Sequence, residues 1–144
     1  MYYLIIPIIT LILDQLLKSY TVNNIPMGGE INIIPHFLSL TYVKNYGAAW
    51  SMMIGQQLLF SLISIVALVA IGYYFIKNKD AILRISLALL MGGIIGNWLD
   101  RLRFHYVVDM FQFKFIDFPI FNIADTAITI GVIILIAYLL FKKE

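Results

Sequence analysis

The fold class of this chain is decided by the stretch QLLFSLISIVALVAIGYYFI, which runs from Gln57 to Ile76. It is the clearest part of a longer run without charged residues, which begins at Asn45. A helix needs about 20 apolar residues to cross a hydrocarbon core of roughly 30 Å. The stretch therefore predicts a transmembrane helix.

Three further segments have the same character. They run from about Tyr2 to Tyr20, from about Ala81 to Asp100 and from about Asn122 to Phe141. The chain is 62% hydrophobic and only 12% charged, whereas an ordinary soluble domain carries about 25% charged residues. We predict one α-helical membrane domain of 144 residues with four transmembrane helices. The first segment lacks a basic start and contains Asp14, so we expect a retained span rather than a cleavable signal peptide.

Several classes of function are excluded by composition. The chain has no cysteine, so it has no disulfide, thiolate metal site or cysteine nucleophile. Its two histidines are too few for a histidine metal cluster. The net charge is +2 without a basic run, which argues against a nucleic-acid partner.

The basic residues orient the predicted bundle by their position rather than their number. They divide equally between the two sides, but those on one side crowd next to span ends in short segments, where the positive-inside rule is strongest. These are Lys77, Lys79, Arg84, Lys142 and Lys143. We therefore expect both termini in the cytoplasm and two outer loops, at about 21–56 and 101–121.

Both outer loops show strand patterns. Apolar residues alternate with polar ones between Ile31 and Val43, among Gly, Pro and Asn, which predicts a hairpin or small sheet. In the second loop Phe111, Phe113 and Phe115 alternate with other residues and predict a strand with an aromatic face. The expected fold is a four-helix bundle with a small extracytoplasmic β-sheet.

Aspartates inside apolar spans need an explanation, because each costs about 3 kcal/mol at the centre of a membrane helix. Asp14 precedes Lys18 by one helical turn, in the acid-first order that favours pairing. We interpret this pair as structural, with a catalytic Asp14 as the alternative. Asp100 adjoins Arg101, which predicts a second ion pair at the membrane surface.

The third span combines small residues with polar ones. Gly92 and Gly96 form a small-xxx-small pair that lets another helix approach closely. Gly93, Asn97 and Asp100 lie on a neighbouring face. Helix packing accounts for the glycines but less well for Asn97.

Two acids have the fewest local partners. Asp109 lies among apolar and aromatic residues with only His105 nearby, and Asp125 has no basic residue one helical turn away. By contrast, Asp117 has Lys114 within reach. Two carboxylates brought together share a proton, so that one acts as general base and the other as general acid. This predicts an aspartyl protease, with an ordinary loop acid as the alternative for Asp109.

These residues fall in motifs of a known family. The chain resembles the lipoprotein signal peptidases, also called signal peptidase II, over essentially its whole length. The matching segments are DQ at 14–15 with Lys18, NYGAAW at 45–50, GGIIGNWLDR at 92–101, VVD at 107–109 and FPIFNIAD at 118–125. Trp50 and Met110 stand where the family often has Phe.

The resemblance implies a function. Asp109 and Asp125 would be the catalytic dyad. The substrate would be a bacterial prolipoprotein with a diacylglyceryl group on its cysteine, cleaved on the N-terminal side of that cysteine at the outer surface of the cell membrane. It further implies a short amphipathic helix beside the sheet, no metal or organic cofactor, inhibition by globomycin and a monomer.

The other motif residues have expected roles within that resemblance. Asn45, Asn97 and Asn122 would donate hydrogen bonds to the substrate or to the dyad. Arg101 would bind a substrate carbonyl while Asp100 holds its guanidinium. Gly47 suits a loop close to the substrate, Asp14 and Lys18 support the bundle, and membrane lipid surrounds the spans.

Three other functions compete with a signal peptidase. A small proton-coupled transporter component also keeps intramembrane acids, but it would place them near the bilayer midplane, whereas here they gather at one surface. A silent scaffold would not need two unpaired acids. A Ser–Lys peptidase needs a serine near Lys18 or Lys44 in a recognisable setting, and the sequence has none.

Overall fold

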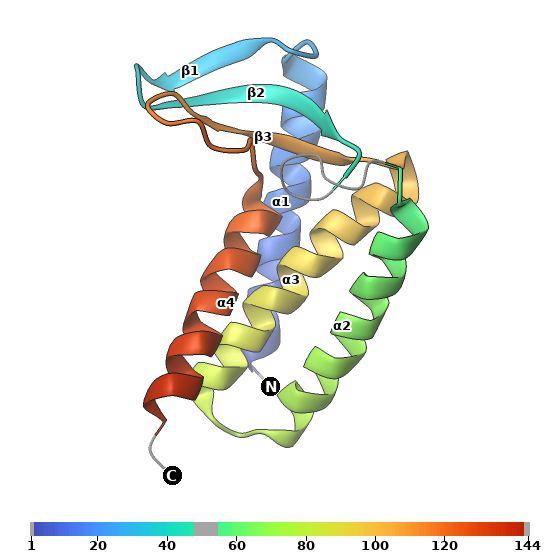
Figure 1. Cartoon of the computed structure of the whole chain (residues 1–144), viewed down its shortest axis with the longest axis vertical. Helices are drawn as coiled ribbons and strands as arrows, with labels where there is room; N and C mark the ends of the chain where they lie inside the picture. Colours follow the sequence, from blue (N-terminus) through green and yellow to red (C-terminus); the bar gives the residue numbers. More distant parts are fainter. Residues whose placement is uncertain (1, 48–54, 143–144) are drawn as a thin grey trace.

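The computed structural model describes residues 2–47 and 55–142. The described part contains four long helices: α1 (Ile5–Asn24), preceded by a 3-10 turn, α2 (Gln57–Lys77), α3 (Ala81–Phe104) and α4 (Ile123–Phe141). Each is long and apolar enough to cross a membrane (Figure 1). The prediction of a four-helix membrane protein with a small β-sheet is confirmed.

The bounds of two helices differ from the prediction. Both α1 and α3 continue one turn past the predicted ends at Tyr20 and Asp100. The extra turn of α1 carries Thr21, which is fully buried. The extra turn of α3 ends at His105, whose φ of 61° is left-handed and stops the helix. Hydropathy misses these turns because they are polar and lie beyond the apolar run.

Helix α3 is the centre of the bundle and contacts the other three helices, while α2 packs mainly on α3 (Figure 1). A Cβ at Gly92 would lie 2.8 Å from Thr10 and 2.9 Å from Pro7 of α1. A Cβ at Gly93 would collide with the backbone oxygen of Ala124 in α4. Gly92 thus allows the close approach of another helix that was predicted, and that helix is α1. Gly93 allows the close approach of α4 on the neighbouring face.

The outer faces of the helices are apolar. Only 6% of the most apolar window of α2 is buried inside the protein, and large hydrophobic side chains cover the outward faces of α1, α2 and α4. Such surfaces are stable in lipid and not in water. These outer faces fit a multi-pass membrane protein.

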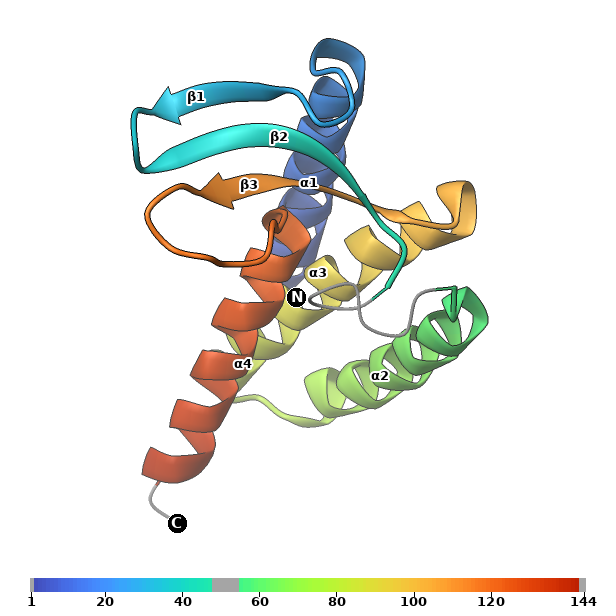
Figure 2. The same ribbon diagram turned by 45° about the horizontal axis from the view of Figure 1, so that its top comes forward.

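The three strands are β1 (Glu30–Ile34), β2 (Leu38–Asn45) and β3 (Val107–Phe113). They form one antiparallel sheet in the order β1-β2-β3, which lies across one end of the bundle (Figure 2). The predicted hairpin in the first outer loop is confirmed. The predicted strand in the second loop is shifted: it begins at Val107, and Phe115 lies outside it. Val108 and Met110 explain the earlier start, since they are fully buried in the core beneath the sheet.

The start of α1 and the end of α4 both lie at the end of the bundle opposite the sheet (Figure 1). An even number of spans requires this arrangement. Residues 48–54 between β2 and α2 lie outside the described part of the chain, and with them the Ala48, Ala49 and Trp50 of the predicted motif. The amphipathic helix implied by the resemblance is not among the elements of residues 2–47 and 55–142.

Candidate active site

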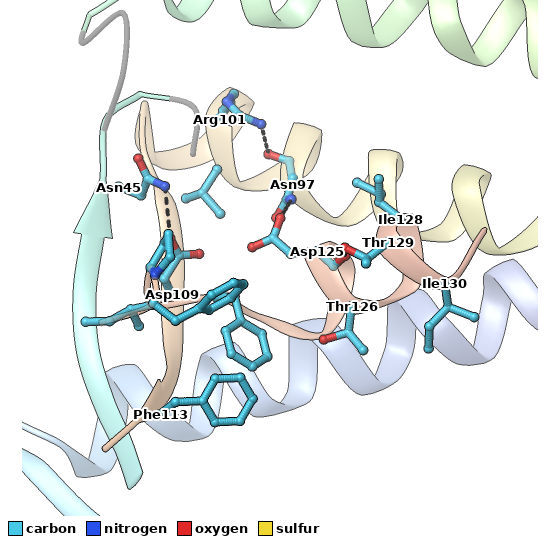
Figure 3. A pocket seen from close by; sticks show the side chains of 15 residues that line it. Asn45, Asn97, Arg101, Asp109, Phe113, Asp125, Thr126, Ile128, Thr129 and Ile130 are labelled. Carbon is cyan, nitrogen blue, oxygen red and sulfur yellow. Dashed lines mark hydrogen bonds between the residues drawn. The ribbon is translucent and has the colours of Figure 1, made fainter. Parts of the chain in front are cut away.

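A cavity of about 440 Å³ opens where α4 begins, beside β3. Asp109 and Asp125, called the dyad below, both line it and point into it from β3 and α4 (Figure 3). Its polar end also contains Asn45, Asn97 and Arg101, and its remaining lining is largely apolar. The structure thus brings together the two acids that have the fewest local partners in the sequence.

Asp109 is positioned by the sheet. It pairs with Val43 across β2 and β3, and Asn45 follows two residues later on the same face of β2. The side-chain nitrogen of Asn45 accordingly reaches Asp109 Oδ2 at 2.9 Å. His105, the predicted local partner, makes no hydrogen bond or ion pair to this carboxylate in the described structure.

Asp125 is positioned by the start of α4. Phe121 pairs with Phe111 of β3 through backbone hydrogen bonds, which places the next residue, Asn122, beside the sheet. Asn122 is the N-cap of α4 and forms a capping box with Asp125. The dyad therefore consists of one residue on β3 and one residue in the first turn of α4. The backbone pairing of Phe121 with Phe111 holds the start of α4 against β3.

All four carboxylate oxygens of the dyad accept a hydrogen bond. Asp109 receives the amide of Asn122 at 2.7 Å as well as that of Asn45. Asp125 receives the amide of Asn97 at 2.7 Å and the backbone N–H of Asn122 at 3.2 Å. Donors on every oxygen hold both carboxyl groups in fixed orientations.

The environment makes Asp109 a weak acid. Burial, and next the negative charge of Asp125, raise its pKa to about 7, against the lowering effect of the hydrogen bonds from Asn45 and Asn122. Asp109 is only 2% exposed, and desolvation of its charged form is the main cause of the raised pKa. Asp109 therefore holds a proton in neutral solution far more readily than an ordinary aspartate does.

Arg101 lines the same cavity with a guanidinium that is only partly used. It donates to the backbone oxygen of Gly47 at 3.2 Å and to that of Asn97 at 3.4 Å, and it stacks over the ring of Phe60, 4.9 Å from its centroid. Its Nε–H is buried without a partner among the described residues. The predicted pairing with Asp100 is wrong, because that carboxylate turns toward α1.

A buried ion cluster, formed by Asp14, Lys18 and Asp100, lies behind the dyad. Lys18 Nζ is 2.9 Å from Asp14 Oδ2 and 2.9 Å from Asp100 Oδ2. Gln15 bridges the two carboxylates, at 3.2 Å and 3.0 Å. The predicted Asp14–Lys18 pair is confirmed, and Asp100 joins it because Gly96 lets α1 and α3 approach closely.

At the sheet, a further predicted pairing is wrong. Lys114 contacts Glu30 at 2.8 Å and not Asp117. Lys114 follows β3 and Glu30 lies on β1, so this ion pair spans the middle strand β2. The pair is about one-third exposed on both sides.

The comparisons with known proteins agree on one family. A family model described as signal peptidase (SPase) II matches residues 6–141. The lipoprotein signal peptidase of Lactobacillus johnsonii is 51% identical over 99% of this chain and 94% of its own. The chain belongs to the signal peptidase II family.

More distant relatives and solved structures extend this family relation. The lipoprotein signal peptidase of Enterococcus faecalis is 42% identical over 99% of this chain and 89% of its own. A bacterial membrane enzyme solved by the in meso method at 2.3 Å superposes with a TM-score of 0.94 and 36% identity, over 99% of this chain and 93% of that one. Another, solved at 1.9 Å, gives 0.91 and 37%, over 99% and 94%. This family member is a peptidase in a multi-pass membrane fold, and the transporter alternative is wrong.

The predicted site residues of this peptidase separate into two layers. Those lining the cavity are Asn45, Asn97, Arg101, Asp109 and Asp125. Those behind it are Asp14, Lys18, Gly47, Asp100 and Asn122. The residues behind the cavity hold the lining residues in place. The sequence motifs therefore include residues that support the site as well as residues that line the cavity.

Some residues at the site were missed or misplaced from sequence. Phe60 and Gln15 had no predicted role. Phe60 could not be recognised, because a phenylalanine is ordinary inside an apolar span. Gln15 could have been recognised, because a glutamine beside Asp14 is a second polar residue within a span.

The three- and four-residue spacing of Asn122, Asp125, Thr126 and Thr129 predicts one inward-facing stripe on the fourth span. Thr126 and Thr129 instead line the cavity with exposed side chains. Their hydroxyls donate to α4 carbonyls one turn earlier, at 2.9 Å and 2.8 Å.

Proposed function

We propose that the protein is an aspartyl endopeptidase that removes signal peptides from diacylglyceryl-modified prolipoproteins, cutting N-terminal to the lipidated cysteine. The observation that carries this proposal is the convergence of Asp109 and Asp125 on one cavity in a member of the signal peptidase II family. The names of its relatives support the substrate class.

The proposed reaction uses one proton shared by the dyad. The ionised carboxylate takes a proton from water, and the water oxygen attacks the scissile carbonyl carbon. The protonated carboxyl gives its proton to the carbonyl oxygen, which produces a neutral tetrahedral diol. The carboxyl that took the proton from water then gives it to the amide nitrogen, while the other carboxylate takes a proton from one diol hydroxyl. The C–N bond breaks, the carboxyl product and the amine of the cysteine are released, and the dyad again holds one proton. The raised pKa of Asp109 suits it to begin as the protonated member.

Arg101 supports the same reaction from the side of the cavity. Its Nε–H, which has no hydrogen-bond partner within residues 2–47 and 55–142, and its charge lie beside the dyad, where a substrate carbonyl would need a donor. The apolar part of the cavity includes Phe113, Phe118 and Ile128. An apolar signal peptide or acyl chain could lie against these side chains while the peptide bond meets the acids.

The proposal includes an orientation. The start of α1 and the end of α4 lie opposite the sheet, and the basic residues near them favour a cytoplasmic location. The dyad would then face the outer surface, where a prolipoprotein arrives with its lipid in the bilayer. We further propose that the peptidase acts as a monomer surrounded by lipid and that globomycin competes with substrate for the cavity.

The test of the function uses purified protein in detergent and one prolipoprotein in two forms, with and without the diacylglyceryl group. We expect cleavage of the lipidated form, seen as a gel shift, with the lipidated cysteine as the new N-terminus by mass spectrometry. We expect no cleavage of the unlipidated form. Folded protein that leaves the lipidated precursor intact would refute the proposal.

The pH dependence of kcat/KM follows from the dyad. Because Asp109 has a pKa of about 7, the dyad keeps its shared proton below that pH and loses it as the pH rises. A doubly ionised dyad lacks the general acid, so we expect kcat/KM to fall on the alkaline side with an apparent pKa near 7. Rates measured from pH 5 to 9 on the lipidated precursor check this. A rate that still rises above pH 8 would contradict it.

A further inference from the structure

The ion cluster of Asp14, Lys18 and Asp100 is too deeply buried to be an ordinary surface ion pair. The three residues are 0%, 3% and 1% exposed, and none of them lines the cavity. Buried ion pairs are weak contributors to stability, since apolar side chains of similar size often replace them without loss. A purely structural cluster is therefore an incomplete explanation of three charges in a membrane bundle.

Both carboxylates of the cluster hold the backbone next to the dyad. Asp14 Oδ1 accepts the backbone N–H of Ala124 at 2.9 Å. Asp100 Oδ2 accepts the backbone N–H of Val108 at 3.1 Å. Each of these N–H groups belongs to the residue directly before a dyad member. The cluster thus anchors the strand and the helix that carry the two acids.

Lys18 makes a third connection, through a side chain. Its Nζ donates to Asn97 Oδ1 at 3.1 Å, and the other end of that amide donates to Asp125 Oδ1 at 2.7 Å. An ammonium group has donors only, so Asn97 must turn its oxygen toward Lys18. Reversal of the amide would set its NH₂ against the ammonium and its oxygen against the carboxylate. The lysine therefore favours, together with the Asn122 amide that donates to the same oxygen at 3.0 Å, the orientation in which an N–H faces Asp125.

We propose that Lys18 is a positioning residue for the dyad, acting through Asn97, and not only the neutralising partner of Asp14. The inference rests on the proposed function of the dyad. The effect of Lys18 on the rate of cleavage passes through the side-chain amide of Asn97. A lysine that serves only the stability of the bundle would act independently of that amide.

A double-mutant cycle tests this claim, with kcat and KM measured on the lipidated precursor for Lys18→Met, Asn97→Ala and the double variant. We expect Asn97→Ala to lower kcat about 100-fold, as loss of one catalytic hydrogen-bond donor does. We expect about 10-fold for Lys18→Met, because the Asn122 amide still donates to Asn97 Oδ1 at 3.0 Å and retains part of the orientation. The double variant should lose no more than Asn97→Ala alone, with KM changed less than about 3-fold throughout.

Three controls keep the outcomes separate. Lys114→Met makes the same chemical change at the exposed pair with Glu30 and should leave kcat unchanged. If Lys18→Met does not fold, the variant Asp14→Asn/Lys18→Met keeps the net charge of the cluster and should show the same loss of kcat. Thermal unfolding in detergent is recorded for every variant, so that loss of folded protein is not counted as loss of rate.

Several results would overturn the inference. One is a double variant whose loss is the product of the two single losses. Another is a Lys18→Met protein with full kcat and only a lower melting temperature, or a charge-compensated variant that also fails to fold. If wild-type protein does not cleave the lipidated precursor, the proposed function fails and this inference fails with it; if wild type cleaves and the cycle is multiplicative, only the inference fails.

Discussion

Asp109→Asn and Asp125→Asn should each lower kcat on a lipidated prolipoprotein by about 1,000-fold or more, since a positioned general acid or base contributes about 10² to 10⁴. An amide has nearly the shape of a carboxyl group but cannot take a proton from water or supply one. In Asp109→Asn, moreover, the new NH₂ must face one of the two amide donors, Asn45 or Asn122, that hold the carboxylate. The measurement is single-turnover cleavage followed by gel shift.

The control for this pair of variants is Asp117→Asn, which makes the same change at an exposed loop acid. It should cleave within about 2-fold of wild type, as surface substitutions away from special contacts are usually near neutral. Asp125→Asn also alters the reciprocal half of the α4 capping box, in which Asp125 Oδ2 accepts the backbone N–H of Asn122, so each variant is compared at equal folded concentration. Normal cleavage by either dyad variant would show that the dyad is misassigned.

Gly93→Ala should destabilise the protein by about 3 kcal/mol and abolish most of its activity. A Cβ at this position meets the backbone oxygen of Ala124 and lies 2.7 Å from Cγ1 of Ile128. Backbone cannot rotate out of the way as a side chain can, so α3 and α4 must separate, and overpacking of this kind costs about 1–3 kcal/mol or more. The displacement occurs next to Asp125 and would move it away from its partner.

Gly72→Ala provides the matched comparison. A Cβ on this glycine of α2 has nothing within 4 Å, and alanine is the better helix former by about 1 kcal/mol. Thermal unfolding in detergent should therefore show a clear fall for Gly93→Ala and no fall for Gly72→Ala. Equal melting temperatures would mean that the α3–α4 contact is looser than the structure indicates.

The positions of the helices were predictable to within a turn. Hydropathy and length are local properties, and the apolar runs had to be spans because unpaired backbone groups cannot remain in lipid except in helices and closed barrels. The hairpin was also predictable from its alternation. The shift of β3 was not, since Val107 and Val108 belong to the strand only because a core beneath the sheet buries them.

Within the site, the two acids were predictable because both lack local partners. The sequence analysis identified the three asparagines but could not assign their partners. Only the folded chain shows that Asn97 donates a hydrogen bond to Asp125, while Asn45 and Asn122 donate to Asp109. Side-chain amides carry no charge pattern that sequence spacing can pair. Their partners depend on which helix and strand come together.

What the amino-acid sequence determined was the membrane fold, the family motifs and which carboxylates stand without a neighbour. What the tertiary structure alone decided was the pairing of charges: Lys18 with Asp100 across two helices, and Lys114 with Glu30 across the sheet. The physical reason is the separation of the paired residues along the sequence. Spacing along a helix reveals only contacts within one turn, whereas these pairs are created by the close approach of α1 and α3 at Gly96 and by the order of the strands.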